Sequence, residues 1–514
     1  METVSRTLRG MPRRVLGAVI AAACWCAGCA WRPAQLAPLA SWPENDETVF
    51  ALDADRDGRP DFWEYQRPDG RKQAIAYTLP GTPQPGPRIA LDALPAYECP
   101  HLVIVLDGVP FEVVDELWQQ GHFRLFYPPS RVVCCFPSMT DLALAEMFHT
   151  GPCLGYQAMY FDRRANRLSD GSAVYLSGRN SPWLARMSYR CSLWWDVKVY
   201  LDPQAVFDHE VNGLKRAFRA VETGEAYAYS VGSAGLATRG GRPAIVRYLL
   251  ELDQLCEQIV YERHGRVKIT LTADHGHNLV ENRLVSFDWL LKAGGYRPAK
   301  SLRGPRDVVT ITYGLVTYAE FCTRDPAGVA ACLLQHEDAE FACYPAGEEI
   351  IVCDRGGQAR IARGPAGFVY DCCHGDPLDL ADIVAALRRE GQVTAAGEID
   401  ADALFRATVD HRYPDPLARV WGAFHDTVQN PPDLIVNLRD GACHGSKFFG
   451  ALVGKVSSTH GSLNRLNSTT FVMTMLGELP PALRSREVRP ALETLRDRPA
   501  GATLDIAPHT SRRF

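Results

Sequence analysis

Acidic, imidazole and hydroxyl side chains follow several apolar runs of this 514-residue sequence. They are Asp107, the hydroxyls of Ser138 and Thr140, the pair Asp274-His275, and His460. Carboxylate oxygens and imidazole nitrogens are ligands that zinc and similar divalent cations accept. A cation lowers the pKa of a neighbouring hydroxyl, and the N–H groups of a helix N-terminus favour an anionic group. These residues therefore predict a divalent-cation site with a nucleophilic hydroxyl.

Buried strands must position these side chains. His101 to Leu106 and Val267 to Thr272 are typical of strands that a parallel sheet buries on both faces. Asp141 to His149 and Ala244 to Arg263 have apolar residues at helical spacing. Strands that alternate with helices predict an α/β fold with a doubly wound, mostly parallel sheet. Ligands of such sheets bind at the carboxyl ends of the strands, where Asp107 and Asp274 fall.

The chain divides into five predicted segments. Residues 1–29 form a signal segment, 30–97 a tether with an acidic loop, and 98–300 the first part of the core. Residues 301–430 form an α+β insertion or cap, with a hairpin near Gly356-Gly357 and a helix from Pro377 to Arg389. Residues 431–514 return to the core through the apolar run Asp433 to Leu438 and end in a C-terminal tail.

The N-terminal segment has the three parts of a secretory signal. Four arginines precede the apolar run Val15 to Cys24, which is too short to span a membrane. Cys26-Ala27-Gly28-Cys29 resembles a lipoprotein processing box, and plain cleavage near Ala30 is the alternative. We expect export to the periplasm, or an outer-membrane lipoprotein whose only membrane contact is a lipid on Cys29.

Composition excludes several classes of function. The net charge of -5 gives no basic surface for nucleic acid. No P-loop, no GxGxxG turn after a strand and no GxSxG elbow occurs, so triphosphate, dinucleotide and serine-hydrolase readings lack support. The 16 cysteines contain no CxxC pair, which argues against a zinc ribbon. Their pairing cannot be read from the sequence.

Four motifs resemble one known family. VIVLDG at 103–108, FPSMT at 136–140, TLTADHGH at 270–277 and STHGSL at 458–463 look like the landmarks of the type I phosphodiesterase/nucleotide pyrophosphatase branch of the alkaline phosphatase superfamily. By this resemblance Asp107, Thr140, Asp274 and His275 hold one divalent cation, zinc or manganese. Thr140 is then the nucleophile, Ser138 a substrate-binding hydroxyl, and His460 part of a second cation site.

The sequence departs from this family at the second site. The family supplies an Asp and a His from a segment that matches 228–241 here, where Ser233 stands for the Asp and Ala237 or Thr238 for the His. The number of ions, one or two, stays open. Arg239 is a candidate to clamp phosphate oxygens in compensation. His277, His444 and Asp440 are further candidates for a replacement ligand.

A separate acidic motif precedes the core. Its side chains stand at the ligand positions of an EF-hand calcium loop: Asp53, Asp55, Asp57, Asp61 and Glu64, with Gly58 at the sharp turn. The flanks contain Pro60 and do not predict two long helices. We expect a structural calcium loop outside the catalytic site.

Three functions compete on the sequence alone. The first is a metal-dependent hydrolase of phosphoric mono- or diesters that acts on a small phosphorylated substrate. The second is a catalytically degenerate relative that binds an anionic ligand or an envelope partner. The third is a transferase that passes a phosphoryl-type group from Thr140 to an alcohol.

Overall fold

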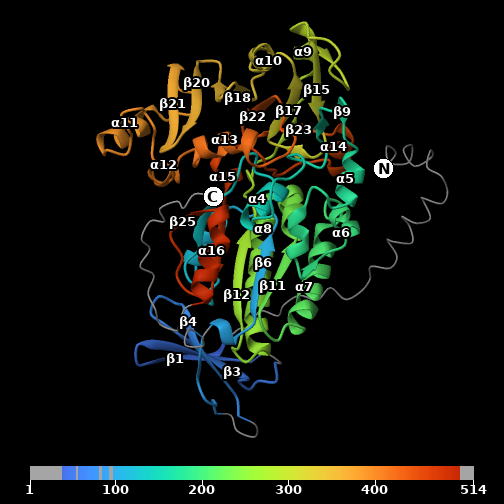
Figure 1. Cartoon of the computed structure of the whole chain (residues 1–514). Helices are drawn as coiled ribbons and strands as arrows, with labels where there is room; N and C mark the ends of the chain where they lie inside the picture. The colour runs from blue at the N-terminus through green and yellow to red at the C-terminus, as the bar shows by residue number, and fades with distance from the viewer. Residues whose placement is uncertain (1–37, 54–55, 80–83, 92–95, 498–514) are drawn as a thin grey trace, which may run out of the picture.

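The computed structural model describes residues 38–53, 56–79, 84–91 and 96–497. Five sheets form within these residues, and the three largest follow one another along the molecule: an N-terminal sheet, a central sheet and a second large sheet (Figure 1). The predicted signal segment with Cys29, and Asp55 of the acidic loop, lie outside the described residues. Within the described residues, no helix combines the length and apolarity that crossing a membrane needs.

The central sheet is the α/β core that the sequence predicts. Its strands, in spatial order, are β10 (Tyr189–Arg190), β11 (Glu225–Ser230), β6 (His101–Leu106), β12 (Lys268–Ala273), β24 (Thr469–Thr474), β7 (Ser130–Val133) and β25 (Ala482–Arg484). The first four strands run parallel, and β24 runs antiparallel to both of its neighbours. The predicted fold class, a mostly parallel sheet, is confirmed.

Helices cover both faces of this sheet. Side chains of β6 alternate between them, so Leu102 and Ile104 pack with α3 (Phe111–Gln119) and α8 (Gly232–Glu262). Val103 and Val105 pack with α4 (Thr140–Met147) and α16 (Ser485–Arg496) on the other face. Helix α7 (Pro203–Arg219) lies against α8. Burial on both faces explains why every residue of β6 and β12 is buried.

The second large sheet takes most of its strands from the segment 301–430 that the sequence predicts as an insertion. Its order is β14 (Arg297–Pro298), β15 (Asp307–Ile311), β17 (Tyr318–Thr323), β22 (Leu434–Leu438), β18 (Ala339–Ala346), β19 (Glu349–Cys353), β20 (Gln358–Gly364) and β21 (Gly367–His374). Helices α9 (Asp288–Ala293) and α10 (Pro326–Leu333) pack on one face. The other face carries α11 (Ala381–Arg389), α12 (Ala401–Thr408) and α13 (Pro416–His425).

The strand at Asp433 to Leu438 belongs to this second sheet, which corrects its predicted place in the core. Strand β22 pairs antiparallel with both β17 and β18. Its residues alternate between the apolar clusters on the two faces of the sheet, as Val436 and Ile435 show. A strand buried on both faces has the same apolar sequence in either sheet, so the pattern could not choose between them.

The N-terminal segment is a folded sheet from residue 38 onward, where the sequence predicted a tether. It comprises β1 (Pro38–Glu44), β2 (Glu47–Leu52), β3 (Phe62–Gln66), β4 (Lys72–Tyr77) and β5 (Ile89–Ala90), all antiparallel. It attaches to the end of α8, where the Tyr77 hydroxyl donates to the carbonyl of Tyr261 over 3.1 Å.

The remaining elements are short. They are η2 (Ala96–Glu98), β8 (Phe161–Asp162), β9 (Arg167–Leu168), α5 (Gly171–Leu176), η3 (Pro182–Arg186), α6 (Leu193–Lys198), β13 (Arg283–Leu284), β16 (Leu315–Val316), β23 (Ala442–Gly445), α14 (Lys447–Val453) and α15 (Arg465–Ser468). Each cysteine of the described residues is a free thiol.

Candidate metal centre

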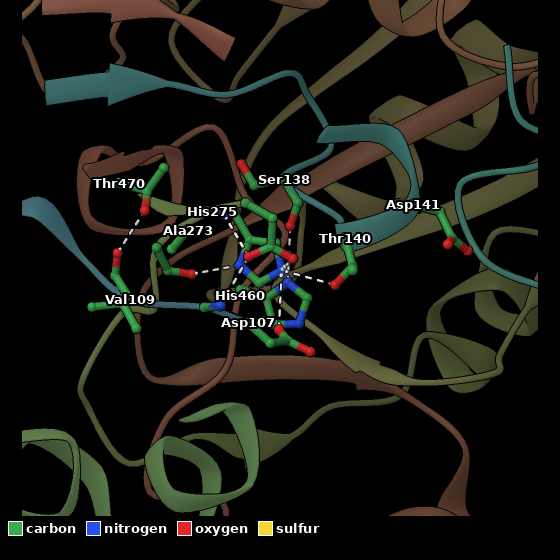
Figure 2. Close-up of polar contacts among 12 residues, drawn as sticks. Asp107, Val109, Ser138, Thr140, Asp141, Ala273, His275, His460 and Thr470 are labelled. Atoms are coloured by element: carbon green, nitrogen blue, oxygen red, sulfur yellow. Dashed lines mark hydrogen bonds and ion pairs between the residues drawn. The ribbon is translucent and has the colours of Figure 1, made fainter. Parts of the chain in front are cut away.

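Two acids meet at the carboxyl ends of neighbouring strands. Leu106 of β6 is in register with Ala273 of β12, so Asp107 and Asp274 leave the sheet side by side. Figure 2 shows this region, with α4 and the loop of His460 facing the strand ends. Asp274 and His275 are fully buried, and Asp107 nearly so. The predicted clustering of these three residues is what the structure has.

One oxygen of each carboxylate is held by the protein and the other is not. The Tyr229 hydroxyl donates to Asp107 Oδ2 over 2.6 Å, and Gly108 N donates to Asp274 Oδ1 over 2.9 Å. Asp107 Oδ1 and Asp274 Oδ2 have no hydrogen-bond partner among the described residues. Burial raises the pKa of both carboxyl groups. A buried oxygen without a partner is costly, and a bound cation would remove that cost.

The ring of His275 points a free nitrogen at these oxygens. Its Nδ1 lies 2.9 Å from the carbonyl of Gly276, which can only accept, so Nδ1 carries the proton and Nε2 a lone pair. Nε2 lies 3.5 Å from Asp274 Oδ2 and 3.7 Å from Asp107 Oδ1. Burial lowers the pKa of His275 to about 4, which keeps the ring neutral and able to bind a cation.

Thr140 completes this cluster. It is the first residue of α4, and its Oγ1 donates to His275 Nε2 over 3.2 Å. The next residue, Asp141, accepts hydrogen bonds from Asn180 and Trp183 that fix the start of the helix. Thr140 is partly exposed, unlike the acids beneath it. Thr140 is therefore the most exposed member of the group formed with Asp107, Asp274 and His275.

Ser138 has a different place from the substrate-binding role predicted for it. Its hydroxyl is buried, donates to the carbonyl of Ser462 over 3.0 Å and accepts from Arg419 over 3.2 Å. Its main-chain carbonyl accepts a hydrogen bond of 2.8 Å from His460 Nδ1. Ser138 therefore positions His460, whose ring stacks on that of His275 with 3.9 Å between centroids.

The segment expected to carry the second cation site is helical here. Ser233, Ala237 and Thr238 lie buried in the first part of α8, before the helix kinks at Gly241. The Ser233 hydroxyl bonds to the main chain of Asp107. Arg239 is exposed, and its guanidinium contacts the carbonyl of Val453, so the structure does not bring it to the acids.

Of the replacement ligands, only His277 joins the cluster. Within the part of the chain that the structure describes, two groups of side chains have ligand atoms within 4.8 Å of one another: Asp107, Asp274 and His275, and also His275, His277 and His460. His444 instead packs beside the rings of Phe287 and Phe321, with 5.6 and 6.3 Å between centroids. Asp440 accepts from the amide of Asn467 over 3.2 Å.

The acidic loop forms the turn between β2 and β3. Asp53 accepts from the main-chain N–H groups of Arg56 and Gly58, and Asp57 accepts from that of Arg59. Glu64 lies outside the loop on β3, and its carboxylate contacts Lys72 Nζ at 3.1 Å. The structure therefore does not support Glu64 as a loop ligand. Calcium binding by the remaining acids, Asp61 among them, stays a prediction.

Two residues that support the site were not predicted from the sequence. Tyr229 orients Asp107, and Glu210 caps the start of α8 by accepting from Val231 N and Gly232 N at 2.8 and 2.9 Å. The signal for Tyr229 was its position near the end of a strand next to β6. The sequence around Glu210 gives no sign that its side chain contacts the main chain of Val231 and Gly232.

The first cluster fits a divalent cation by its donors. Two carboxylate oxygens, one imidazole nitrogen and one hydroxyl are an oxygen-rich set with one nitrogen, which suits a divalent cation. Each ligand residue also has a hydrogen bond that fixes its orientation, as is usual in metal sites. Asp107 accepts from Tyr229, Asp274 accepts from Gly108 N, and His275 donates to the Gly276 carbonyl.

No protein-family model matches the sequence, and no curated protein does. Solved structures similar to the chain include a phosphonoacetate hydrolase from Sinorhizobium meliloti 1021 with phosphonoformate: 14% identity, TM-score 0.39, covering 84% of this chain and 100% of that one. Human ectonucleotide pyrophosphatase/phosphodiesterase 5 has 10% identity, TM-score 0.42 and coverages of 80% and 96%. The murine ectonucleotide pyrophosphatase/phosphodiesterase 5 has 10% identity and a TM-score of 0.39, and the match covers 80% of this chain and 97% of that one.

Proposed function

We propose that the chain is a metal-dependent phosphoric ester hydrolase with Thr140 as its nucleophile. One observation carries this proposal. Thr140 Oγ1 lies 3.2 Å from a ring nitrogen of His275, which itself lies 3.5 and 3.7 Å from two carboxylate oxygens that have no partner among the described residues. A hydroxyl, an imidazole and two acids converge on one point at the edge of the central sheet.

The residues divide the work between them. Asp107, Asp274 and His275 would hold a divalent cation, which lowers the pKa of a neighbouring hydroxyl and neutralises charge on phosphoryl oxygens. Thr140 presents its oxygen from the first turn of α4, where the helix N–H groups favour an anionic phosphoryl group. The Thr140 oxygen forms a bond to phosphorus, and the bond from phosphorus to the ester oxygen breaks. Solvent takes the Thr140 proton and protonates the departing alkoxide, and water then hydrolyses the Thr140 ester.

The test is an ester assay with matched variants. The full chain, with added Mn²⁺ or Zn²⁺, is assayed on bis-p-nitrophenyl phosphate and p-nitrophenyl phosphate beside Thr140→Ala and Asp274→Asn. Thr150→Ala, which removes a hydroxyl just beyond α4, is the control. We expect turnover in the wild type and control and a loss of at least about a hundredfold in the other two. Equal turnover in all four would overturn the proposal.

A degenerate binding protein is the alternative, and the state of Ser233 favours it. Neither a carboxylate nor an imidazole comes from the start of α8, so a second cation would lack those ligands. The binding function is the correct one if neither ester is hydrolysed and a calorimetric titration shows that inorganic phosphate binds only when the metal is present. Transfer to an added alcohol, seen as a phosphorylated alcohol product, would indicate the transferase.

Export is part of the proposal. The segment before residue 30 has the features of a signal, and Cys29 of a lipidation site. Expression of the full chain with radiolabelled palmitate should label the wild type and not Cys29→Ser. An unlabelled wild type that is recovered in the periplasmic extract would indicate plain cleavage.

A further inference from the structure

Three imidazoles gather beside the acids, and the proposed hydrolysis uses only one of them. His275, His277 and His460 each place one ligand nitrogen within 4.8 Å of the others. Figure 2 shows the stacked rings of His275 and His460 next to Asp107. The ring of His277 lies 5.1 Å from that of His460 and 6.0 Å from that of His275, between centroids.

Each ring has one nitrogen that carries the proton and one that carries a lone pair; on His275 that lone pair accepts the Thr140 hydroxyl. Nδ1 of His275 and of His460 donates to a main-chain carbonyl, that of Gly276 or Ser138. Nδ1 of His277 lies 3.0 Å from Ser458 Oγ. That oxygen already accepts from Leu279 N, and its own proton points to the side chain of Asn278 at 3.4 Å. In all three rings the remaining nitrogen, Nε2, therefore carries a lone pair.

The space around His277 is shaped for this arrangement. A Cβ atom on Gly108 would lie 2.3 Å from His277 Cδ2 and 2.5 Å from its Nε2, and 3.3 Å from His275 Cε1. Gly108 has a φ of 66°, so the backbone beside Asp107 both turns and makes room for the two rings. His277 is 1% exposed, and its Nε2 has no partner among the described residues. A buried lone pair without a donor is the state that a cation relieves.

We propose that His275, His277 and His460 form a second cation site, made of imidazoles alone, which adjoins the carboxylate site and shares His275 with it. His277 supplies the ligand that the start of α8 does not. An all-nitrogen set favours zinc, cobalt, nickel or copper over manganese and magnesium, which prefer oxygen.

Sharing has a consequence for stoichiometry. His275 has a single lone-pair nitrogen, Nε2, so only one ion can bind through it. An ion in the carboxylate site leaves the imidazole site with two protein ligands, and an ion in the imidazole site leaves the carboxylate site without its nitrogen ligand. The wild-type chain therefore binds one ion tightly per chain, and the identity of the ion selects its position. The inference concerns binding and stands whether or not the chain turns over an ester.

The experiment reads metal binding and not activity. The metal-free full chain and the double variant Asp107→Asn/Asp274→Asn are titrated with Co²⁺, followed by visible absorbance, and with Mn²⁺, followed by free-ion electron paramagnetic resonance. His277→Asn is added to the double variant, because an asparagine amide can still donate to Ser458 while Nε2 is lost. His444→Asn, which truncates another buried neutral histidine with an unpartnered Nε2, is the matched control.

The expected results separate the two sites. The double variant should no longer bind Mn²⁺ but should still bind one Co²⁺ per chain. Adding His277→Asn should then weaken the affinity for Co²⁺ by at least about tenfold, whereas adding His444→Asn should leave that affinity unchanged. Cu²⁺ loaded into the double variant should show coupling to three nitrogens, which tests the ligand set without touching His277. Coupling to a single nitrogen, or equal Co²⁺ affinity with and without His277, overturns the proposal. Failure of the ester assay alone leaves these results unchanged.

Discussion

The Ser233 hydroxyl and the main chain of Asp107 form two hydrogen bonds. Ser233 Oγ donates to the Asp107 carbonyl over 2.7 Å and accepts from the Asp107 N–H over 3.0 Å. The residue that stands where a second-site ligand was expected thus supports a first-site ligand. Ser233 is therefore part of the frame that holds Asp107.

Replacing Ser233 with alanine tests this frame. Ser233→Ala removes the donor to the Asp107 carbonyl, while Asp107 N keeps its bond of 3.0 Å to the Ser230 carbonyl. Because one buried acceptor loses its partner, we expect a loss of about 1–3 kcal/mol in the free energy of unfolding. Urea unfolding measures it, and Ser233→Thr, which keeps a hydroxyl, is the comparison. A Ser233→Ala chain as stable as the wild type would refute the role.

Tyr229 should matter most when no metal is bound. Tyr229→Phe keeps the ring, which packs edge-on against Trp183 with 4.9 Å between centroids. It removes the hydroxyl that donates to Asp107 Oδ2. We expect the variant to lower the free energy of unfolding of the metal-free chain by about 1–3 kcal/mol. The loss in the Mn²⁺-saturated chain should be smaller, because the cation then stabilises the carboxylate. Equal losses in both states would show that Tyr229 acts only through packing.

A buried acid of the second sheet gives a pH-dependent prediction. Burial raises the pKa of Glu320 from 4.5 to about 7, although its Oε1 accepts from Gln157 at 2.9 Å and Tyr318 at 3.1 Å. Between about pH 4.5 and 7 the unfolded chain loses this proton and the folded chain keeps it, so Glu320 makes stability fall as pH rises across that window.

Glu320→Gln should remove that fall, because the amide oxygen can still accept both bonds. Relative to the wild type, the free energy of unfolding of the variant should rise by at most about 3 kcal/mol between pH 4.5 and pH 7, and the difference should stay constant above pH 7. Urea midpoints at pH 5 and pH 8 measure the gain, with Glu348→Gln as a control at an exposed position. A gain that grows toward low pH has the wrong sign and would contradict the assignment.

The core and the first cation cluster could be predicted from the sequence because both follow from continuous patterns. The apolar run before Asp107 indicates a strand buried on both faces, and the carboxyl end of that strand is where ligands bind. The same pattern misplaced β22, since burial on both faces does not say which sheet a strand joins. The sheet from residue 38 was mistaken for a tether because its prolines concealed short antiparallel strands.

The supporting contacts could not be predicted, because each joins residues far apart in the chain. The bond from Tyr229 to Asp107 spans 122 positions, and that from Ser233 to Asp107 spans 126. In the acidic loop, a local spacing predicted a contact that the structure does not have. Its spacing matched a calcium loop through Glu64, but Glu64 falls on a strand and turns to Lys72, a partner that no local spacing contains.

That pairing predicts how the N-terminal sheet is attached. Lys72 is buried between Glu64 of its own sheet and Glu257 of α8. Lys72→Met leaves two acids without their cation, so we expect a loss of about 3–5 kcal/mol, with the N-terminal sheet released first. Limited proteolysis near residue 96 and urea unfolding would detect it. Adding Glu64→Gln to Lys72→Met should recover part of the loss. If the double variant is no more stable than Lys72→Met, the two residues are not coupled and Glu64 is again available to the acidic loop.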